Sequence, residues 1–179
     1  MAIPPEARAA AALAVRDNFL QSVYLPKGAA LSAYMPFNGE MDTIPLVDAL
    51  LQRGYTMLMP RTPPDQTIIE FRTWSHTTPM YRTMYGILEP FSEHSDSRIP
   101  DIFIMPLLAF DGKGNRLGYG AGYFDQTLMM LARGKVKFLT VGVAFQMQYY
   151  DGVPAETHDY TLDMCVTNEK VYDFRGMRK

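Results

Sequence analysis

Short apolar runs alternate with amphipathic segments along most of the chain, and prolines and glycines separate them. The runs at 29–35, 55–59, 101–105, 138–144 and 162–167 have the length of buried strands. Their continuous hydrophobicity is typical of strands covered on both faces. The pattern therefore predicts a sheet at the centre of the molecule.

Three segments between or before these runs have the composition and spacing of helices. Residues 7–20 are rich in alanine and follow two prolines, which suit a helix start. Residues 44–52 place their leucines and valine on one face, with Thr43 expected as the N-terminal cap. A third helix is expected over 123–133, and 67–74 alternates like an additional edge strand. This alternation of strands and helices predicts an α/β fold with parallel neighbours.

The chain of 179 residues is long enough for one domain and short for two. It contains no internal repeat, heptad pattern or linker, so we expect a single domain over residues 1–179. The stretch 75–100 is polar and punctuated by prolines, and we expect it to wrap the surface.

Composition narrows the class of protein. Hydrophobic residues make up 47% and charged residues 20%, which excludes a collagen, a disordered low-complexity chain and a disulfide scaffold. A net charge of −2 provides no global attraction to nucleic acid or to an anionic membrane. No run approaches the roughly 20 apolar residues of a membrane span. The one cysteine, Cys165, is expected to be an inert thiol in the core. We expect a cytoplasmic protein.

The segment 105–125 is the candidate for chemistry. It leaves an apolar run, passes through Gly118, Gly120 and Gly122, and enters the expected helix. Glycines allow close approach of the backbone to a ligand, and amides at a helix N-terminus attract phosphate. Arg116 would supply a permanent positive charge, and Asp125 is an oxygen ligand of the kind that Mg²⁺ prefers. The spacing alone equally fits a glycine-rich turn followed by a capping aspartate, and it matches neither a P-loop nor a dinucleotide fingerprint.

The same segment resembles the signature of 5-formyltetrahydrofolate cyclo-ligases, also called 5,10-methenyltetrahydrofolate synthetases. Three further segments resemble motifs of that family in the family's order: 33–36 with 40–43, 86–90, and 158–159 with 162–163. The resemblance covers roughly residues 29–168.

The resemblance implies a single three-layer α/β domain with a mostly parallel central sheet flanked by helices. It also implies ATP- and Mg²⁺-dependent closure of 5-formyltetrahydrofolate to 5,10-methenyltetrahydrofolate, with release of ADP and phosphate. ATP would phosphorylate the formyl oxygen, and N10 of the folate would then attack the activated carbon. Such a reaction depends on positioning and charge stabilisation rather than on a protein nucleophile. We expect a monomer with no nucleic-acid or membrane partner.

Roles carry over residue by residue from this resemblance. Arg116 would be the catalytic residue, and Asp125 and Asp159 would hold Mg²⁺. ATP would contact Arg116, Leu117, Gly118, Tyr119, Gly120, Ala121, Gly122, Tyr123 and Phe124. The folate would contact Met35, Glu40, Tyr85, Tyr119, Gly120, Ala121, Gly122 and Tyr123.

The chain departs from the family at its start. The family has a Lys-x-x-x-Arg pair there that reaches ATP, whereas here Arg8 and Arg16 lack that spacing. Either the chain is shortened or another cation substitutes. The alternative function is therefore a folate- or nucleotide-binding protein of the same fold with little turnover. A sugar-phosphate or acyl-CoA enzyme on a similar scaffold rests on analogy of fold alone.

Overall fold

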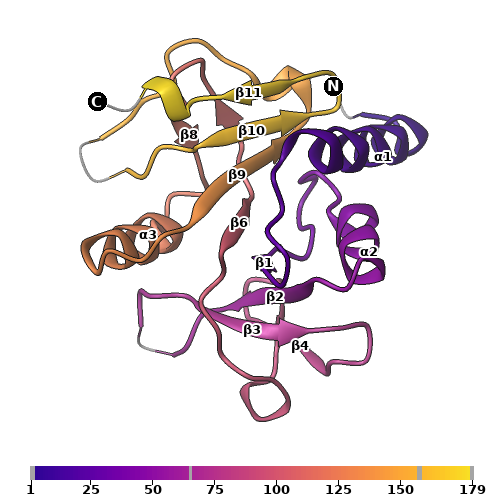
Figure 1. The fold of residues 1–179 in the computed structure, drawn as a ribbon, viewed down its shortest axis with the longest axis vertical. Helices are drawn as coiled ribbons and strands as arrows, with labels where there is room; N and C mark the ends of the chain where they lie inside the picture. The colour runs from indigo at the N-terminus through magenta and orange to yellow at the C-terminus, as the bar shows by residue number, and fades with distance from the viewer. Residues whose placement is uncertain (1–2, 65, 157–158, 178–179) are drawn as a thin grey trace.

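A seven-stranded sheet forms the centre of the molecule in a computed structural model that describes residues 3–64, 66–156 and 159–177 (Figure 1). From one edge to the other its strands are β11 (Val171–Asp173), β10 (Met164–Thr167), β9 (Leu139–Ala144), β6 (Ile102–Met105), β1 (Ala30–Ser32), β2 (Thr56–Arg61) and β3 (Glu70–Trp74). The five central strands, β10 to β2 in this order, are parallel, and the two edge strands are antiparallel to their neighbours. The predicted mostly parallel sheet is confirmed.

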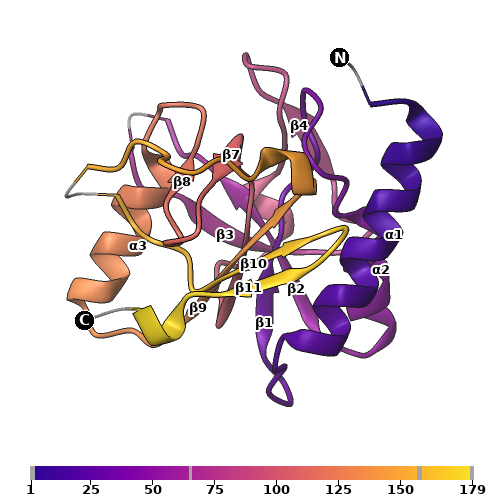
Figure 2. The same ribbon diagram turned by 90° about the horizontal axis from the view of Figure 1, so that it is seen from above.

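Helices cover both faces of this sheet. Helices α1 (Pro5–Ser22) and α2 (Ile44–Gln52) pack on one face, and α3 (Tyr123–Arg133) packs on the other, as Figure 2 shows from above. The bounds of α2 and α3 are those that the sequence predicts, because proline, glycine and polar residues punctuate both ends. The predicted three-layer arrangement is confirmed.

Each face of the sheet has its own hydrophobic core. Phe19 of α1 and Leu50 of α2 are fully buried on one face, while Phe103 of β6 and Leu128 of α3 are buried on the other. Cys165 is fully buried in the second core, and burial raises the pKa of its thiol far above the usual value. The prediction of a buried thiol is confirmed.

The start of α2 corrects one prediction from the sequence. Thr43 occupies the N-terminal cap position, but its side chain makes no capping hydrogen bond. Its Oγ1 instead donates to the carbonyl of Tyr34 at 2.7 Å, and Asp42 Oδ1 accepts the amide of Ile44 at 2.9 Å. The side chain of Thr43 therefore ties α2 to the end of the preceding segment. The strand expected over 29–35 is likewise shorter than predicted, since only Ala30–Ser32 pairs as β1.

The structure also contains short elements outside the central sheet, which the sequence did not predict. The surface stretch 75–100 contains the hairpin of β4 (Met80–Arg82) and β5 (Leu88–Pro90), followed by the 3-10 turn Ser92–His94. A second hairpin joins β7 (Ala109–Phe110) to β8 (Arg116–Leu117). Further 3-10 turns are Gln146–Gln148 and Arg175–Met177. These elements are too short for hydrophobic periodicity to reveal.

Within the described part of the chain, no helix has both the length and the hydrophobicity needed to cross a membrane.

Candidate functional site

The candidate residues gather on loops at the edge of the sheet where the parallel strands end. Strands β1 and β6 are neighbours, yet the chain continues from β1 to β2 on one side and from β6 to β9 on the other. Open α/β sheets bind ligands at such a reversal of strand order, beyond the carboxyl ends of the strands. The loops 33–43 and 106–122 flank this point. Figure 2 shows β4, β7, β8 and the start of α1 on this same side of the molecule.

Glu40 closes a tight turn in the first of these loops. Asn38 and Gly39 both have positive φ angles, 48° and 89°, as the two central residues of a type I′ turn require. The amide of Glu40 donates to the carbonyl of Phe37 at 3.1 Å, and Glu40 Oε2 accepts the amide of Phe37 at 2.9 Å. The residue is 9% exposed, and this burial raises the pKa of the carboxyl despite the hydrogen bond from Phe37. Glu40 is therefore a buried acceptor on a defined turn.

Tyr119 connects this turn to the glycine-rich loop. The Tyr119 hydroxyl lies near the Glu40 carboxylate. Their interaction raises the pKa of Tyr119 and partly offsets the rise that burial causes in the pKa of Glu40. Partial burial is the larger cause of the raised pKa of Tyr119, although about half of the residue is exposed. Met35, which precedes the same turn in the chain, is half-buried against the core. The fold thus brings Tyr119 beside Glu40, from which the sequence places it far away.

The glycine-rich loop begins after a braced hairpin turn. Buried Asp111 accepts the amides of Lys113 and Asn115 on Oδ1, and the Asn115 side chain donates to Oδ2 at 2.8 Å. Gly114, with φ +84°, packs so closely that a Cβ there would lie 2.9 Å from the carbonyl oxygen of Leu162. The hairpin that carries Arg116 is therefore held firmly at its far end.

Two glycines of the loop need their conformational freedom. Gly120 has φ +90° and Gly122 has φ +68°, in the left-handed region that side chains disfavour. No heavy atom would lie within 4 Å of a Cβ on Gly120, so conformation rather than space requires glycine there. Gly122 occupies the N-terminal cap position of α3, and the amides of the first turn follow it. Such a helix start favours an anionic group.

Arg116 and Asp125 form an ion pair below this loop. Arg116 Nη2 donates to Asp125 Oδ1 at 2.9 Å, and the two side chains are 6% and 15% exposed. The guanidinium also lies 6.0 Å from the ring centroid of Phe124. A Cβ on Gly118 would lie 3.1 Å from Arg116 Nη1, so glycine allows the loop to cross directly over the guanidinium. Among the described residues, Arg116 Nε has no hydrogen-bond partner.

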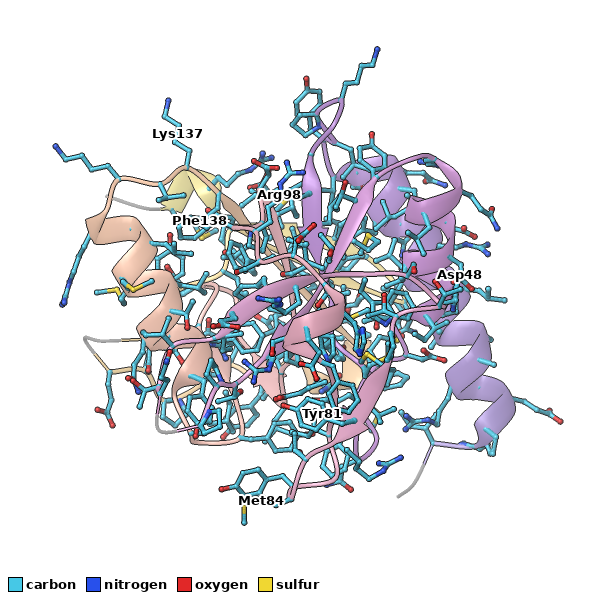
Figure 3. All side chains as sticks on the ribbon, turned by 90° about the horizontal axis from the view of Figure 1, so that it is seen from below. Asp48, Tyr81, Met84, Arg98, Lys137 and Phe138 are labelled. Atoms are coloured by element: carbon cyan, nitrogen blue, oxygen red, sulfur yellow. The ribbon has the colours of Figure 1, made fainter. Side chains whose placement is uncertain are left out.

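Tyr85 lies at the tip of the hairpin of β4 and β5. A Cβ on Gly86 would lie 3.2 Å from the ring of Phe37, so the tip packs beside the Glu40 turn. Met84 and Tyr85 are largely exposed, and Figure 3 shows Met84 extending away from the body of the molecule beyond Tyr81. The Tyr81 hydroxyl donates to buried Glu89 at 2.8 Å and ties the two strands of the hairpin together. The tip is therefore an apolar projection at the rim of the site.

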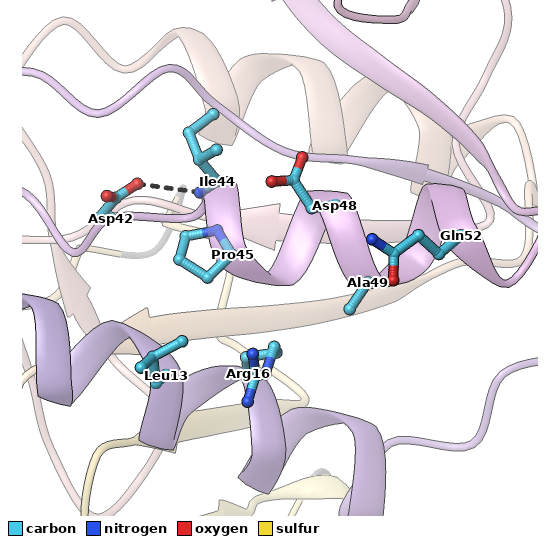
Figure 4. A pocket seen from close by; sticks show the side chains of 8 residues that line it. All are labelled: Leu13, Arg16, Asp42, Ile44, Pro45, Asp48, Ala49 and Gln52. Atoms are coloured by element: carbon cyan, nitrogen blue, oxygen red, sulfur yellow. Dashed lines mark hydrogen bonds between the residues drawn. The ribbon is translucent and has the colours of Figure 1, made fainter.

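Two hollows lie near these loops. One of about 500 Å³ borders the Glu40 turn at Gly39 and has mainly apolar and aromatic walls. It is lined by Ile3, Arg8, Gly39, Leu108, Ala109, Phe145, Met147, Gln148, Tyr149 and Tyr150. The other, of about 380 Å³, lies between α1 and α2 and includes Leu13, Arg16 and Asp48 (Figure 4). None of the predicted site residues lines either hollow, but the first adjoins the Glu40 turn through Gly39.

The sequence profile of the 5-formyltetrahydrofolate cyclo-ligase family matches residues 1–168. The chain belongs to this family.

Named relatives and a solved structure agree with the assignment. The 5-formyltetrahydrofolate cyclo-ligase of Haemophilus influenzae is 34% identical over 137 residues, which cover 74% of this chain and 72% of the relative. The cyclo-ligase of Escherichia coli K12 is 32% identical over 149 residues, 80% of each chain. The NMR structure of Aquifex aeolicus 5,10-methenyltetrahydrofolate synthetase superposes with a TM-score of 0.80 at 28% identity, covering 99% of this chain and 88% of that one.

The cyclo-ligase family implies ATP as co-substrate. The sequence also predicts Mg²⁺ at Asp125 and Asp159, so the surroundings of these two carboxylates matter. The amide of Tyr160 donates to Asp125 Oδ1 at 3.0 Å, so the segment that contains Asp159 lies against Asp125. Asp159 Oδ2 accepts the amide of Glu156 at 2.7 Å. Within the described ranges, no group of three or more Asp, Glu, His or Cys could hold a metal by itself. Mg²⁺ commonly takes one or two carboxylates and completes its shell with phosphates and water. The residues thus suit Mg²⁺ carried by ATP rather than a cage built by protein alone.

Arg8 is the site residue that sequence reasoning did not place. Its guanidinium donates to the carbonyls of Gly39 and Glu40, at 3.2 and 2.9 Å. The sequence shows only a cation near the start of a helix, and no local signal predicts which loop it reaches. The aromatic walls of the adjoining hollow, Phe145 and Tyr149, follow β9 and were likewise assigned no role.

Proposed function

We propose that this chain is an ATP-dependent cyclo-ligase that converts 5-formyltetrahydrofolate to 5,10-methenyltetrahydrofolate. The observation that supports it most is the junction of the Glu40 turn with the glycine-rich loop through Tyr119. A folate-binding element and a phosphate-binding element would then meet at the reversal of strand order. That junction is what a transfer of phosphate onto a folate requires, because the two reactants must be held in contact.

The folate would lie against the Glu40 turn. A carboxylate accepts hydrogen bonds from the N–H donors on the edge of a pterin, and charged acceptors form the stronger bonds. Tyr119 lies beside Glu40 and would contact the ring. Met35, which precedes the turn, would contact it as well, and Tyr85 would approach from the hairpin tip. Loop residues from Tyr119 to Tyr123 would be shared between the folate and ATP.

ATP would place its phosphates on the loop from Leu117 to Phe124. The amides around Gly120 and the start of α3 would donate to phosphate oxygens. Arg116 lies under Gly118, so its charge would act directly below the transferring group. Asp125 holds that guanidinium in place. Mg²⁺, held by Asp125 and Asp159, would neutralise charge on the phosphates when bound.

The reaction would proceed in two steps, phosphoryl transfer and then ring closure. The formyl oxygen attacks the γ-phosphorus of ATP, an O–P bond forms, and ADP leaves. N10 of the folate then attacks the formyl carbon, whose oxygen now carries the phosphoryl group. Phosphate departs with the electrons of the C–O bond, and the N10 proton is lost. The product carries the methenyl bridge between N5 and N10. The protein contributes orientation and electrostatic stabilisation, and no covalent intermediate with a side chain is needed.

A single assay tests the proposal. Purified protein is mixed with 5-formyltetrahydrofolate, ATP and Mg²⁺, and the absorbance of the methenyl product is followed. We expect the signal to grow only when both ATP and Mg²⁺ are present. Absence of product, with folate binding detected by calorimetry, would instead support a binding protein with little turnover. Arg8 and Arg16 favour that second candidate, because their guanidinium groups bond the Glu40 turn and Asp17 rather than standing open for phosphate.

Other expectations remain proposals. We propose that residues 1–179 form one domain and that the enzyme acts as a cytoplasmic monomer on 5-formyltetrahydrofolate and ATP with Mg²⁺, without a nucleic-acid or membrane partner.

A further inference from the structure

Arg8 joins the first helix to the turn that carries Glu40. Its Nη2 donates to the carbonyl of Glu40 at 2.9 Å, and its Nη1 donates to the carbonyl of Gly39 at 3.2 Å. One guanidinium thus bonds two successive carbonyls from outside the turn. A planar guanidinium with parallel donors can do this, whereas a lysine ammonium presents a single point of charge.

The tip of the Glu40 turn is exposed, and hydrogen bonds from Arg8 would restrict its movement. Asn38 and Gly39 are exposed and have positive φ angles, and Asn38 is not a glycine. Internal hydrogen bonds between Phe37 and Glu40 close the turn but do not attach it to the rest of the molecule. The Arg8 bonds attach the turn to α1, in addition to the contacts of Phe37 with the hairpin tip and of Glu40 with Tyr119, so they help to set where the Glu40 carboxylate stands relative to the sheet.

Arg8 lies on a helix that is packed against the core. Its helix α1 buries Ala12, Val15 and Phe19 in the core. The guanidinium also lies over the ring of Phe145, with 5.5 Å between Cζ and the ring centroid. Phe145 follows β9, so Arg8 links three parts of the site: the first helix, the Glu40 turn and the aromatic wall of the adjoining hollow.

We propose that Arg8 is a positioning residue for folate recognition, which acts by holding the Glu40 turn. This role rests on the proposed function of Glu40 as the folate acceptor. It differs from the role expected of an N-terminal cation, since Arg8 acts on the folate side of the site and not on ATP.

The test compares Arg8→Ala and Arg8→Lys with Arg16→Ala. Arg16 lies on the same helix, bonds its neighbour Asp17 and touches the other hollow, so it controls for loss of an arginine from α1. We expect Arg8→Ala to raise the KM for 5-formyltetrahydrofolate about tenfold, the value of one charge-assisted hydrogen bond, and Arg8→Lys to raise it less. The kcat and the KM for ATP should stay near those of Arg16→Ala.

A double variant shows whether Arg8 acts through Glu40. In a Glu40→Gln background, the Arg8→Ala change should raise the KM for the folate far less than in the wild type. Fully additive effects would overturn the proposal, as would a rise in the KM for ATP alone. No difference between Arg8→Ala and Arg16→Ala would also overturn it.

Hydrogen exchange tests the brace without any ligand. Amides of residues 34–43 should exchange faster in Arg8→Ala than in Arg16→Ala, because the turn loses its attachment. Equal exchange in the two variants overturns the proposal whatever the kinetics show. A wild type without turnover counts against the proposed function instead, and the exchange of 34–43 then still decides the role of Arg8.

Discussion

Arg116 and Asp125 meet as a largely buried ion pair, with 2.9 Å between Nη2 and Oδ1. Sequence reasoning gave them separate tasks, one toward phosphate and the other toward metal. The structure makes each the neighbour of the other, and the Tyr160 amide donates to the same carboxylate oxygen. The positive charge beneath the glycine-rich loop is therefore held in position before any ligand arrives.

Replacement of Arg116 by alanine should abolish turnover and also destabilise the fold. The change removes the charge under the loop and leaves the Asp125 carboxylate, 15% exposed, without its ionic partner. Breaking a buried pair in this way costs about 3–5 kcal/mol of the free energy of unfolding. Product absorbance and urea denaturation measure the two effects. The double variant with Asp125→Asn should recover part of the stability but no activity, and near-normal turnover in the single variant would contradict the role of Arg116.

Replacement of Asp125 by asparagine separates its two roles. If the carboxylate holds Mg²⁺, as proposed, the Mg²⁺ concentration for half-maximal activity should rise by about tenfold or more. A lower kcat with an unchanged Mg²⁺ midpoint would show that Asp125 acts only by anchoring Arg116. Asp173→Asn is a matched control, because Asp173 also pairs with an arginine, Arg175, but lies on the surface at the end of β11. It should leave the Mg²⁺ midpoint unchanged.

Gly120→Ala should impair the reaction beyond its effect on stability. Gly54 makes a matched control: it has φ +80°, open space around a Cβ, and a place at the end of α2 away from the loop. Each alanine substitution should lower the free energy of unfolding by about 1–2 kcal/mol, since both glycines have a left-handed backbone conformation. Only Gly120→Ala should also lower kcat/KM for ATP, by about tenfold to a hundredfold, as the loop amides move. Equal kinetics in the two variants would argue against phosphate binding by this loop.

Glu40 should make stability depend on pH. Burial raises the pKa of Glu40 in the folded protein above the ordinary value of 4.5. Below 4.5 the group is protonated in both the folded and the unfolded chain. As pH rises through the raised folded pKa, the buried carboxylate must ionise, and the wild type loses stability relative to Glu40→Gln.

Chemical denaturation of both proteins at pH 4 and pH 7 measures this difference. The free energy of unfolding of Glu40→Gln, minus that of the wild type, should be larger at pH 7 than at pH 4. A difference that shrinks with rising pH would show that hydrogen bonds to the charged form outweigh burial.

Much of the architecture can be predicted from the sequence, because residues close together in the chain determine where its helices and strands begin and end. Apolar runs, three of them closed by proline, predict the central strands, and α2 and α3 begin and end at the predicted residues. The glycine-rich segment carries much of the family resemblance. Two of its glycines, Gly120 and Gly122, have positive φ angles, a requirement that acts within a few neighbouring residues.

The features that depend on contacts between distant parts of the chain were decided only by the tertiary structure. Whether the oxygen of Thr43 caps α2 or bonds Tyr34 depends on where the preceding loop lies. That Glu40 meets Tyr119, and that Arg8 reaches the Glu40 turn, follows from the neighbouring positions of β1 and β6 and from the packing of α1 on the sheet. No local pattern encodes these pairs, because their contacts form only after the sheet has assembled. The sequence by itself determined the elements and the chemistry they carry, and the order of strands decided which of those groups face one another.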